Sequence, residues 1–230
     1  MYFPFIDSYY IILVLPAIAI SIWAQMKVKS TFSKYSSVLS TRNITGCDTA
    51  STIMHYNSIT DVKIVPIDGQ LTDNYNPSTN VISLSRPVYS NTSIAAIGVA
   101  AHESGHAVQH HVGYFPIKLR NALVPVANIG STAAIPLAMF GLIFGVPFLI
   151  NFGILLYSAI VLFQVATLPV EFNASRRAIS VLRQRDILSE DELKGAKKVL
   201  SAAALTYVAA TLTSLMSLLR LIFIARGRRD

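Results

Sequence analysis

The chain has 230 residues, of which 53% are hydrophobic and 13% are charged, and it carries a net charge of +7. This composition is typical of a membrane protein. The positive charge requires no nucleic-acid partner, because basic residues next to membrane segments meet anionic lipid head groups. Cys47 is the single cysteine, so the chain can form neither an internal disulfide nor a thiolate zinc cluster.

The first apolar segment runs from Tyr9 to about Gln25. Trp23, near its end, is an expected interfacial anchor. Lys27 and Lys29 follow the apolar run, whereas a signal peptide carries its positive charge before it. We therefore predict an uncleaved N-terminal transmembrane anchor.

A more polar stretch with short elements follows. Thr45 can cap a helix that ends near Asn57. Val62–Val65 and Asn80–Leu84 are predicted strands, with a turn at Asn76–Ser78 between them. An exposed strand edge can pair with an extended peptide, which makes part of the second strand a candidate substrate-binding strand. Its residues are Val81, Ile82, Ser83 and Leu84. An ordinary structural strand is the alternative.

Residues 102–106 spell H-E-x-x-H within a predicted helix. Histidines four residues apart lie on one helix face, so His102 and His106 are candidate ligands of one Zn²⁺ ion per chain. Glu103 then lies beside a zinc-activated water, from which it can take a proton as general base. The motif predicts zinc-dependent hydrolysis of peptide bonds.

A catalytic zinc site usually has three protein ligands, so one more is needed. His110 lies about 12 Å along the helix axis from His102, too far for both to bind one ion. Glu171 is the better candidate, because it lies at the edge of an apolar segment where an unpaired carboxylate is costly. Either it completes a two-His-one-Glu metal site, or it forms a salt bridge with Arg176 or Arg177.

The centre of the chain predicts a membrane hairpin. No charged residue occurs from Asn121 to Val170, a length that fits two helices of about 20 residues each. We expect spans near Leu123–Phe140 and Val146–Thr167. Val199–Leu219 is a further uncharged run, followed by a basic tail that includes Arg228 and Arg229. About four transmembrane helices are therefore expected.

The two crossings of the hairpin return Glu171 to the side of the membrane that holds His102 and His106. Lysines and arginines are frequent on both flanks of the hairpin, so the positive-inside rule places that side in the cytoplasm. The basic tail opposes this assignment, because a complete fourth span puts the tail outside.

We therefore expect an α-helical integral membrane protein with a small α+β zincin-like domain that carries the H-E-x-x-H motif. Its predicted segments are an N-terminal transmembrane anchor (1–26), a cytoplasmic-side zincin-like domain (27–121), a transmembrane helical hairpin (122–168), a third-ligand helix with a basic segment (169–198), and a C-terminal transmembrane helix with a basic tail (199–230).

Several motifs together resemble the YugP-type neutral zinc metallopeptidases of bacterial membranes. The matching segments are Thr45–Gly46, Gly69–Asp73, His102–His110, Leu123–Gly130 and Leu168–Ala178. The resemblance implies a zinc peptidase of the bacterial plasma membrane, with His102, His106 and Glu171 as ligands and Glu103 as catalytic acid and base. More distantly, the layout is similar to HtpX-type proteases, which carry E-x-x-x-D on the third-ligand helix. Ser175 takes the place of that Asp, so the ligand-orienting contacts must be built differently here.

The expected function is that of a membrane-embedded gluzincin endopeptidase with a polypeptide substrate. Ser175, Arg176 and Tyr75 are candidates for orienting a ligand or stabilising the transition state, and Arg177 and Tyr114 are further candidates for the second role. A zinc-binding membrane scaffold without catalytic activity is the alternative function. The sequence indicates neither the substrate's identity nor the oligomeric state.

Overall fold

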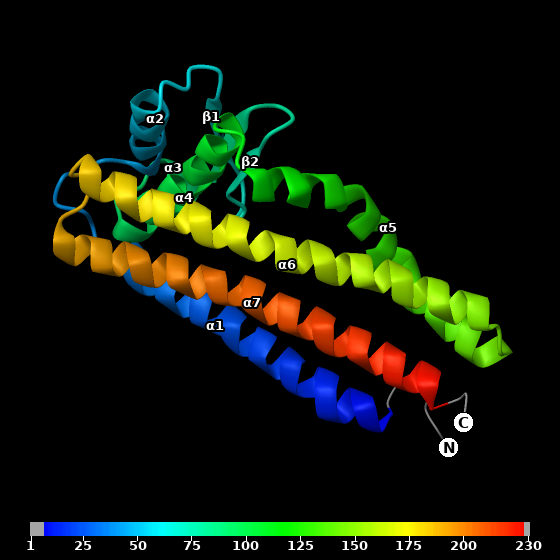
Figure 1. Cartoon of the computed structure of the whole chain (residues 1–230). Coiled ribbons are helices and arrows are strands. Elements are labelled where there is room, and N and C mark those ends of the chain that lie inside the picture. Colours follow the sequence, from blue (N-terminus) through cyan, green and yellow to red (C-terminus); the bar gives the residue numbers. More distant parts are fainter. Residues whose placement is uncertain (1–6, 228–230) are drawn as a thin grey trace. The chain divides into compact units, whose positions relative to one another are not determined.

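The computed structural model describes residues 7–227, so Arg228 and Arg229 of the basic tail lie outside the described residues. The elements in chain order are a π-helical turn (Tyr10–Val14), α1 (Leu15–Ser36), α2 (Gly46–Tyr56), β1 (Lys63–Ile67), β2 (Asn74–Asn76), β3 (Val81–Ser85), α3 (Arg86–Tyr89), α4 (Ile94–His111), α5 (Phe115–Phe144), α6 (Pro147–Gln184) and α7 (Glu190–Arg226) (Figure 1). The prediction of a mostly helical chain with four long apolar helices is confirmed.

The chain divides into two compact units. The first, here called the apolar unit, consists of Met1–Gln25, Lys118–Leu168 and Thr206–Asp230. The second, here called the α+β unit, consists of Met26–Ile117 and Pro169–Leu205. The α+β unit contains every residue of the H-E-x-x-H motif and also Glu171.

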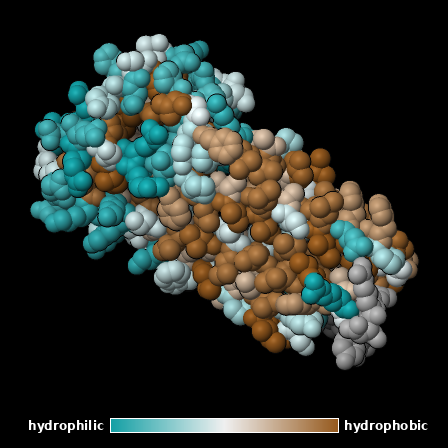
Figure 2. Space-filling model, in the orientation of Figure 1, coloured by the Kyte–Doolittle hydropathy of each residue, from teal (hydrophilic) through white to brown (hydrophobic). Residues whose placement is uncertain are grey.

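Four helices are long and apolar enough to cross a membrane: Tyr10–Ser36, Phe115–Phe144, Pro147–Gln184 and Glu190–Arg226. Hydrophobic side chains cover much of the visible surface of the apolar unit (Figure 2). Each helix is longer than the apolar run that predicts it, because polar residues continue the helix beyond the run. As a result, α6 carries Glu171 on the same continuous helix as the second half of the predicted hairpin.

The hairpin turns at Gly145, whose φ of +68° lies in the left-handed region that favours glycine. Pro125 and Pro136 lie inside α5, which continues through both. Small residues let α5 and α6 approach closely, as is common between membrane helices. A Cβ added at Gly153 would lie 2.7 Å from the Ala134 carbonyl oxygen.

An ion pair joins the two ends of the chain within the apolar unit. Arg220 Nη2 donates to Asp7 Oδ2 at 2.7 Å, and both side chains are partly buried. Thr213 on α7 also contacts Ser21 on α1 through their hydroxyl groups at 3.0 Å. The carboxylate of Asp7 thus neutralises a charge that the sequence places at the end of the last apolar run.

The α+β unit holds a three-stranded sheet with the order β1-β3-β2. Strand β3 pairs in parallel with β1 from Lys63↔Val81 to Ile67↔Ser85, and antiparallel with β2 from Asn74↔Ser83 to Asn76↔Val81. The candidate substrate-binding strand, Val81–Leu84, is therefore the central strand. Both edges of its residues 81–83 are already hydrogen-bonded, and the side chains of Ile82 and Leu84 are buried in the core. The prediction of a free edge there is wrong.

Helix α4 runs through the hydrophobic core of this unit. Ser93 caps its first turn by accepting a hydrogen bond from the backbone N–H of Ala96, and fourteen residues of the helix are buried. The core also contains residues of α2, β3, α6 and α7. Helix α2 begins at the predicted cap, Thr45, which forms a capping box with Asp48. Packing on several sides fixes α4 in place, and with it the histidines it carries.

Candidate metal centre

The H-E-x-x-H motif lies in the second half of α4. His102 and His106 are one helical turn apart, and their rings meet edge to face with centroids separated by 4.7 Å. Helix α6 places Glu171 against both rings. The side chains of His106 and Glu171 are buried, and that of His102 is only slightly more exposed.

The three polar atoms that converge have the separations of a zinc ligand set. Nε2 of His102 lies 3.2 Å from Glu171 Oε2 and 3.2 Å from Nε2 of His106, which in turn lies 3.5 Å from Glu171 Oε2. Tetrahedral ligands at about 2.0–2.1 Å from zinc are about 3.3 Å from one another. Two imidazoles and one carboxylate are also a known catalytic zinc set. The residues therefore fit a zinc ion.

Glu171 makes no ion pair with Arg176 or Arg177 within the described residues. Arg176 instead donates from Nε to the Phe172 carbonyl at 3.3 Å, and Arg177 donates from Nε to Asn173 Oδ1 at 2.8 Å. The salt-bridge alternative for Glu171 therefore has no counterpart in the structure. The buried carboxylate faces the two histidines instead.

A hydrogen-bond chain determines which nitrogen of His106 can bind metal. Gln109 Nε2 donates to the Val170 carbonyl at 2.8 Å and to Asn173 Oδ1 at 3.0 Å, so its Oε1 must face the other way. That oxygen lies 3.0 Å from Nδ1 of His106, which therefore donates to it. The proton on Nδ1 leaves the lone pair of Nε2 directed at Glu171 and His102, as a metal ligand requires.

Sequence reasoning missed Gln109 and the role of Asn173. The available signal was that Gln109 follows His106 by three residues and therefore shares its helix face. The acceptors that orient its amide lie more than sixty residues away on α6, and no spacing rule identifies them. Gln109 is fully buried, which makes its hydrogen bonds costly to lose.

Ser175 orients the other histidine. Its hydroxyl lies 3.1 Å from Nδ1 of His102, on the opposite side of the ring from Glu171. A hydroxyl carries no charge, so it polarises the imidazole less than the carboxylate that occupies this place in HtpX-type proteases. The structure thus brings Ser175 to the histidine pair, whereas Arg176 is exposed.

Replacing Ser175 with alanine is expected to weaken zinc binding by about 10–100-fold, the usual cost of losing a partner that orients a ligand histidine. Competition with a zinc chelator measures the affinity. Ser180→Ala is the matched control, because Ser180 lies on the same helix and its hydroxyl contacts Gln184 rather than a histidine. Equal zinc affinities for the two variants would exclude an orienting role for Ser175.

Glu103 is buried beside the histidines, with 9% of its surface exposed. Burial raises the pKa of Glu103, against the opposing effect of the two neighbouring histidines. Its carboxylate makes no hydrogen bond to any group in the described part of the chain. A desolvated carboxylate with a raised pKa and free lone pairs is suited to proton transfer.

The charge of Glu171 also acts on His106. Burial lowers the pKa of His106, but its hydrogen bond and charge interaction with Glu171 outweigh burial, and the net shift is upward. A metal ion must displace the proton that this shift favours, because ligand imidazoles bind in the neutral form.

Tyr75 does not join this group in the described structure. Its hydroxyl contacts Nδ1 of His110 at 3.0 Å and Asn80 Oδ1 at 3.1 Å, and no hydrogen bond links it to His102, His106 or Glu171. His110 contacts Tyr75 and is not among the residues whose ligand atoms converge. The expectation that His110 is not a metal ligand stays a prediction.

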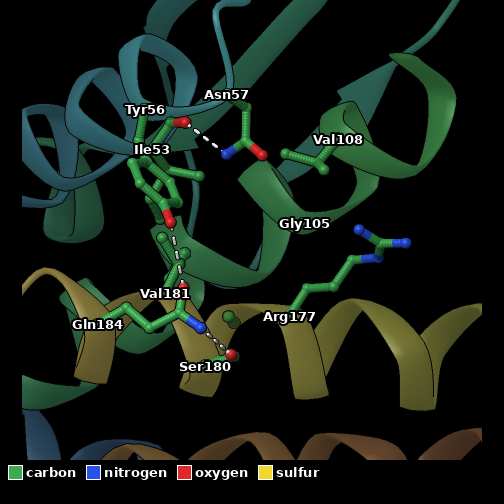
Figure 3. A pocket seen from close by; sticks show the side chains of 11 residues that line it. Ile53, Tyr56, Asn57, Gly105, Val108, Arg177, Ser180, Val181 and Gln184 are labelled. Atoms are coloured by element: carbon green, nitrogen blue, oxygen red, sulfur yellow. Dashed lines mark hydrogen bonds between the residues drawn. The ribbon is translucent and has the colours of Figure 1, made fainter. Parts of the chain in front are cut away.

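Close packing of α4 on α6 holds the site together. A Cβ added at Gly105 would lie 2.8 Å from the Ala174 carbonyl oxygen and 3.2 Å from its Cα, too close for any side chain. A crevice of about 130 Å³ lies beside this contact. Figure 3 shows it, with Tyr56 reaching from α2 to Gln184 on α6. None of the three converging residues lines the crevice, so it is separate from the metal centre.

Gly105→Ala is expected to destabilise the protein by about 1–3 kcal/mol, because the added methyl group overpacks the helix contact. Gly98 on the same helix is the control: its added Cβ would meet Ala196 at 3.5 Å, an ordinary contact, and alanine gains up to about 1 kcal/mol of helix propensity. The unfolding midpoint in detergent separates the two variants. Equal midpoints would contradict the proposed close contact.

Comparison with known proteins supports the same interpretation. Residues 10–226 match the model of a family described as "Putative neutral zinc metallopeptidase". The chain belongs to this family. It is also similar to "Putative membrane protease YugP" of Bacillus subtilis (strain 168), with 48% identity over 221 residues that cover 96% of this chain and 98% of the relative. No solved structure matches the chain significantly. The family predicted from the sequence motifs is confirmed.

Proposed function

We propose that this member of the family is a membrane-embedded zinc endopeptidase of the gluzincin type. His102, His106 and Glu171 would hold one zinc ion, and Glu103 would act as general base and acid. One observation carries the proposal: three ligand atoms lie within 4.8 Å of one another, beside a buried carboxylate that has no partner in the described residues.

Each residue of the centre has a distinct task in this mechanism. When bound, zinc would supply Lewis acidity, which polarises a peptide carbonyl and lowers the pKa of water into the neutral range. Glu103 takes the proton of the attacking water and then donates it to the departing amine. Gln109 and Ser175 hold the two imidazoles with Nε2 toward Glu171. The raised pKa of Glu103 allows it to carry the proton between the two steps.

The proposal places the protein in the bacterial plasma membrane as a multi-pass protein, with residues 27–121 and 169–198 on the cytoplasmic side. The four long apolar helices support the membrane location, and a similar protein is named a membrane protease. Two predicted crossings by α5 and α6 return the chain to the side on which it started. The basic residues that flank this hairpin support the cytoplasmic orientation.

Metal removal tests the function. In detergent, the purified full chain should cleave an unfolded protein such as casein, and a zinc chelator should reduce cleavage to background. One equivalent of zinc should restore it, whereas magnesium should not, because an imidazole-rich site disfavours that ion. Cleavage that survives complete removal of zinc would refute the proposal. Stoichiometric zinc without cleavage of casein or unfolded membrane proteins would favour the scaffold alternative.

A further inference from the structure

A second, larger cavity lies in the α+β unit between α1 and α7, which run side by side in Figure 1. Its volume of about 660 Å³ falls within the range of about 300–1,000 Å³ that is usual for small-molecule sites. The lining residues are Lys27, Thr31, Lys34 and Tyr35 of α1, and Lys194, Lys197, Lys198, Ser201, Ala202 and Leu205 of α7. No candidate zinc ligand is among them.

The lining residues form one face on each helix. On α1 they follow the spacing i, i+4, i+7 and i+8, and on α7 the spacing i, i+3, i+4, i+7, i+8 and i+11. Close helix packing forms one part of the wall. A Cβ at Gly195 would lie 2.8 Å from Cε1 of Tyr35, so glycine lets the tyrosine ring rest against α7. The cavity is thus a built feature of two packed helices.

The charge in this cavity is strongly one-sided. Five of its ten lining residues are lysines, and none is acidic. Of these five lysines, only Lys194 forms an ion pair within the described residues: its Nζ lies 2.8 Å from Asp191 Oδ1. The other carboxylates in the first turn of α7 have different partners: Glu190 binds Arg183, and Glu192 accepts from the backbone N–H groups of Thr41 and Ser189. Four lysines therefore remain available to an anion.

The cavity also changes from charged to apolar along α7. Its face begins with Lys194, Lys197 and Lys198, continues with Ser201, and ends with Ala202 and Leu205. The long uncharged run of α7 continues from there to Leu219. On α1, Lys27 directly follows the apolar run. The lysines are thus the residues that adjoin the apolar segments of both helices. A ligand that fits this gradient has a negative head and an apolar tail.

We propose that this cavity binds the phosphate head group of an anionic phospholipid. The lysines contact the phosphate oxygens, the hydroxyls of Thr31 and Ser201 are in position to add hydrogen bonds, and Ala202 and Leu205 adjoin the acyl chains. Basic pockets between membrane helices are an established way to hold anionic lipids. This inference rests on the membrane location in the proposed function, but not on peptidase activity.

Lipid retention tests the site without any activity assay. The full chain in detergent is titrated with phosphatidylglycerol, or with phosphatidylcholine of the same acyl chains, and adducts are counted by native mass spectrometry. The parent protein should retain phosphatidylglycerol and not phosphatidylcholine. Each neutralised lysine should weaken binding about fivefold, so the double variant K27Q/K198Q should bind about 25-fold more weakly.

The control variant, K29Q/K118Q, removes the same charge from exposed positions outside the cavity and should bind phosphatidylglycerol as the parent does. If K27Q/K198Q and K29Q/K118Q lose equal affinity for phosphatidylglycerol, the lipid is attracted by the overall positive charge rather than by the cavity, and the proposal is overturned. Equal retention of phosphatidylcholine would also overturn it. Inorganic phosphate is the probe without a tail: if it displaces the lipid at comparable concentration, the cavity is a free-anion site and the lipid assignment is wrong.

Discussion

Glu103→Gln should lower kcat for peptide hydrolysis by about 10²–10⁴-fold, the usual contribution of a general acid–base group, and should leave zinc bound. Glutamine keeps the shape of the side chain but cannot take a proton from water. Because the Glu103 carboxylate has no hydrogen-bond partner in the described residues, the substitution breaks no hydrogen bond there. Zinc content should remain at one ion per chain, because the three ligands are unchanged.

The matched control is Glu190→Gln, which removes an exposed carboxylate paired with Arg183. Such surface pairs contribute about 0–1 kcal/mol, so this variant should keep both its zinc and its activity. Turnover numbers and zinc content are measured on the same preparations. If Glu103→Gln turns over casein at the rate of the parent protein, Glu103 is not the base. A loss of zinc in that variant would instead assign Glu103 a role in binding the metal.

The apolar helices could be predicted from the sequence because hydropathy alone identifies a stretch that fits a bilayer. The run from Asn121 to Val170 has no competing interpretation, and α5 and α6 lie where it predicts them. The observed ends of α5 and α6 differ from the predicted ends of the apolar spans, because a helix continues for as long as its backbone hydrogen bonds are satisfied. Polar residues after Thr167 extend α6 to Gln184 without changing its course.

The sheet shows what a sequence pattern leaves open. A short, mostly apolar segment after a turn predicts a strand near Val81–Leu84, and β3 is there. The pattern does not indicate which strands pair with it. Strand β2 consists of three residues, Asn74–Asn76, whose composition favours a turn, so it was not predicted. Its pairing occupies the edge that the candidate substrate-binding strand would have needed.

The candidate site was partly predictable for a similar reason. His102, Glu103 and His106 follow from helical spacing, and Glu171 follows from the cost of an unpaired carboxylate beside an apolar segment. The orienting contacts depend instead on three-dimensional packing. Gln109 matters because the Val170 carbonyl on another helix fixes its amide, and this relation has no signature in the sequence.

Glu171→Gln should weaken zinc binding by more than about 100-fold. Removing a residue that only orients a ligand costs up to about 100-fold in metal affinity, and removing the charge of a ligand itself should cost more. The amide keeps the volume of the side chain but loses the charge that a zinc ligand supplies. Zinc content after dialysis, and affinity from competition with a chelator, measure the effect. The Glu190→Gln variant serves again as control, because it removes an exposed carboxylate remote from the histidines in sequence.

Zinc content in Glu171→Gln discriminates between models of the whole centre. If α6 supplies the third ligand, zinc binding requires residues from both flanks of the predicted membrane hairpin, and the variant should lose zinc. The unfolding midpoint of the metal-free variant should stay close to that of the metal-free parent. If zinc binding is unchanged, the H-E-x-x-H helix binds metal without α6, and the convergence at 3.2 Å and 3.5 Å reflects only a histidine–carboxylate contact. That result would also remove the shared metal site as a reason to place both flanks of the hairpin on one side of the membrane.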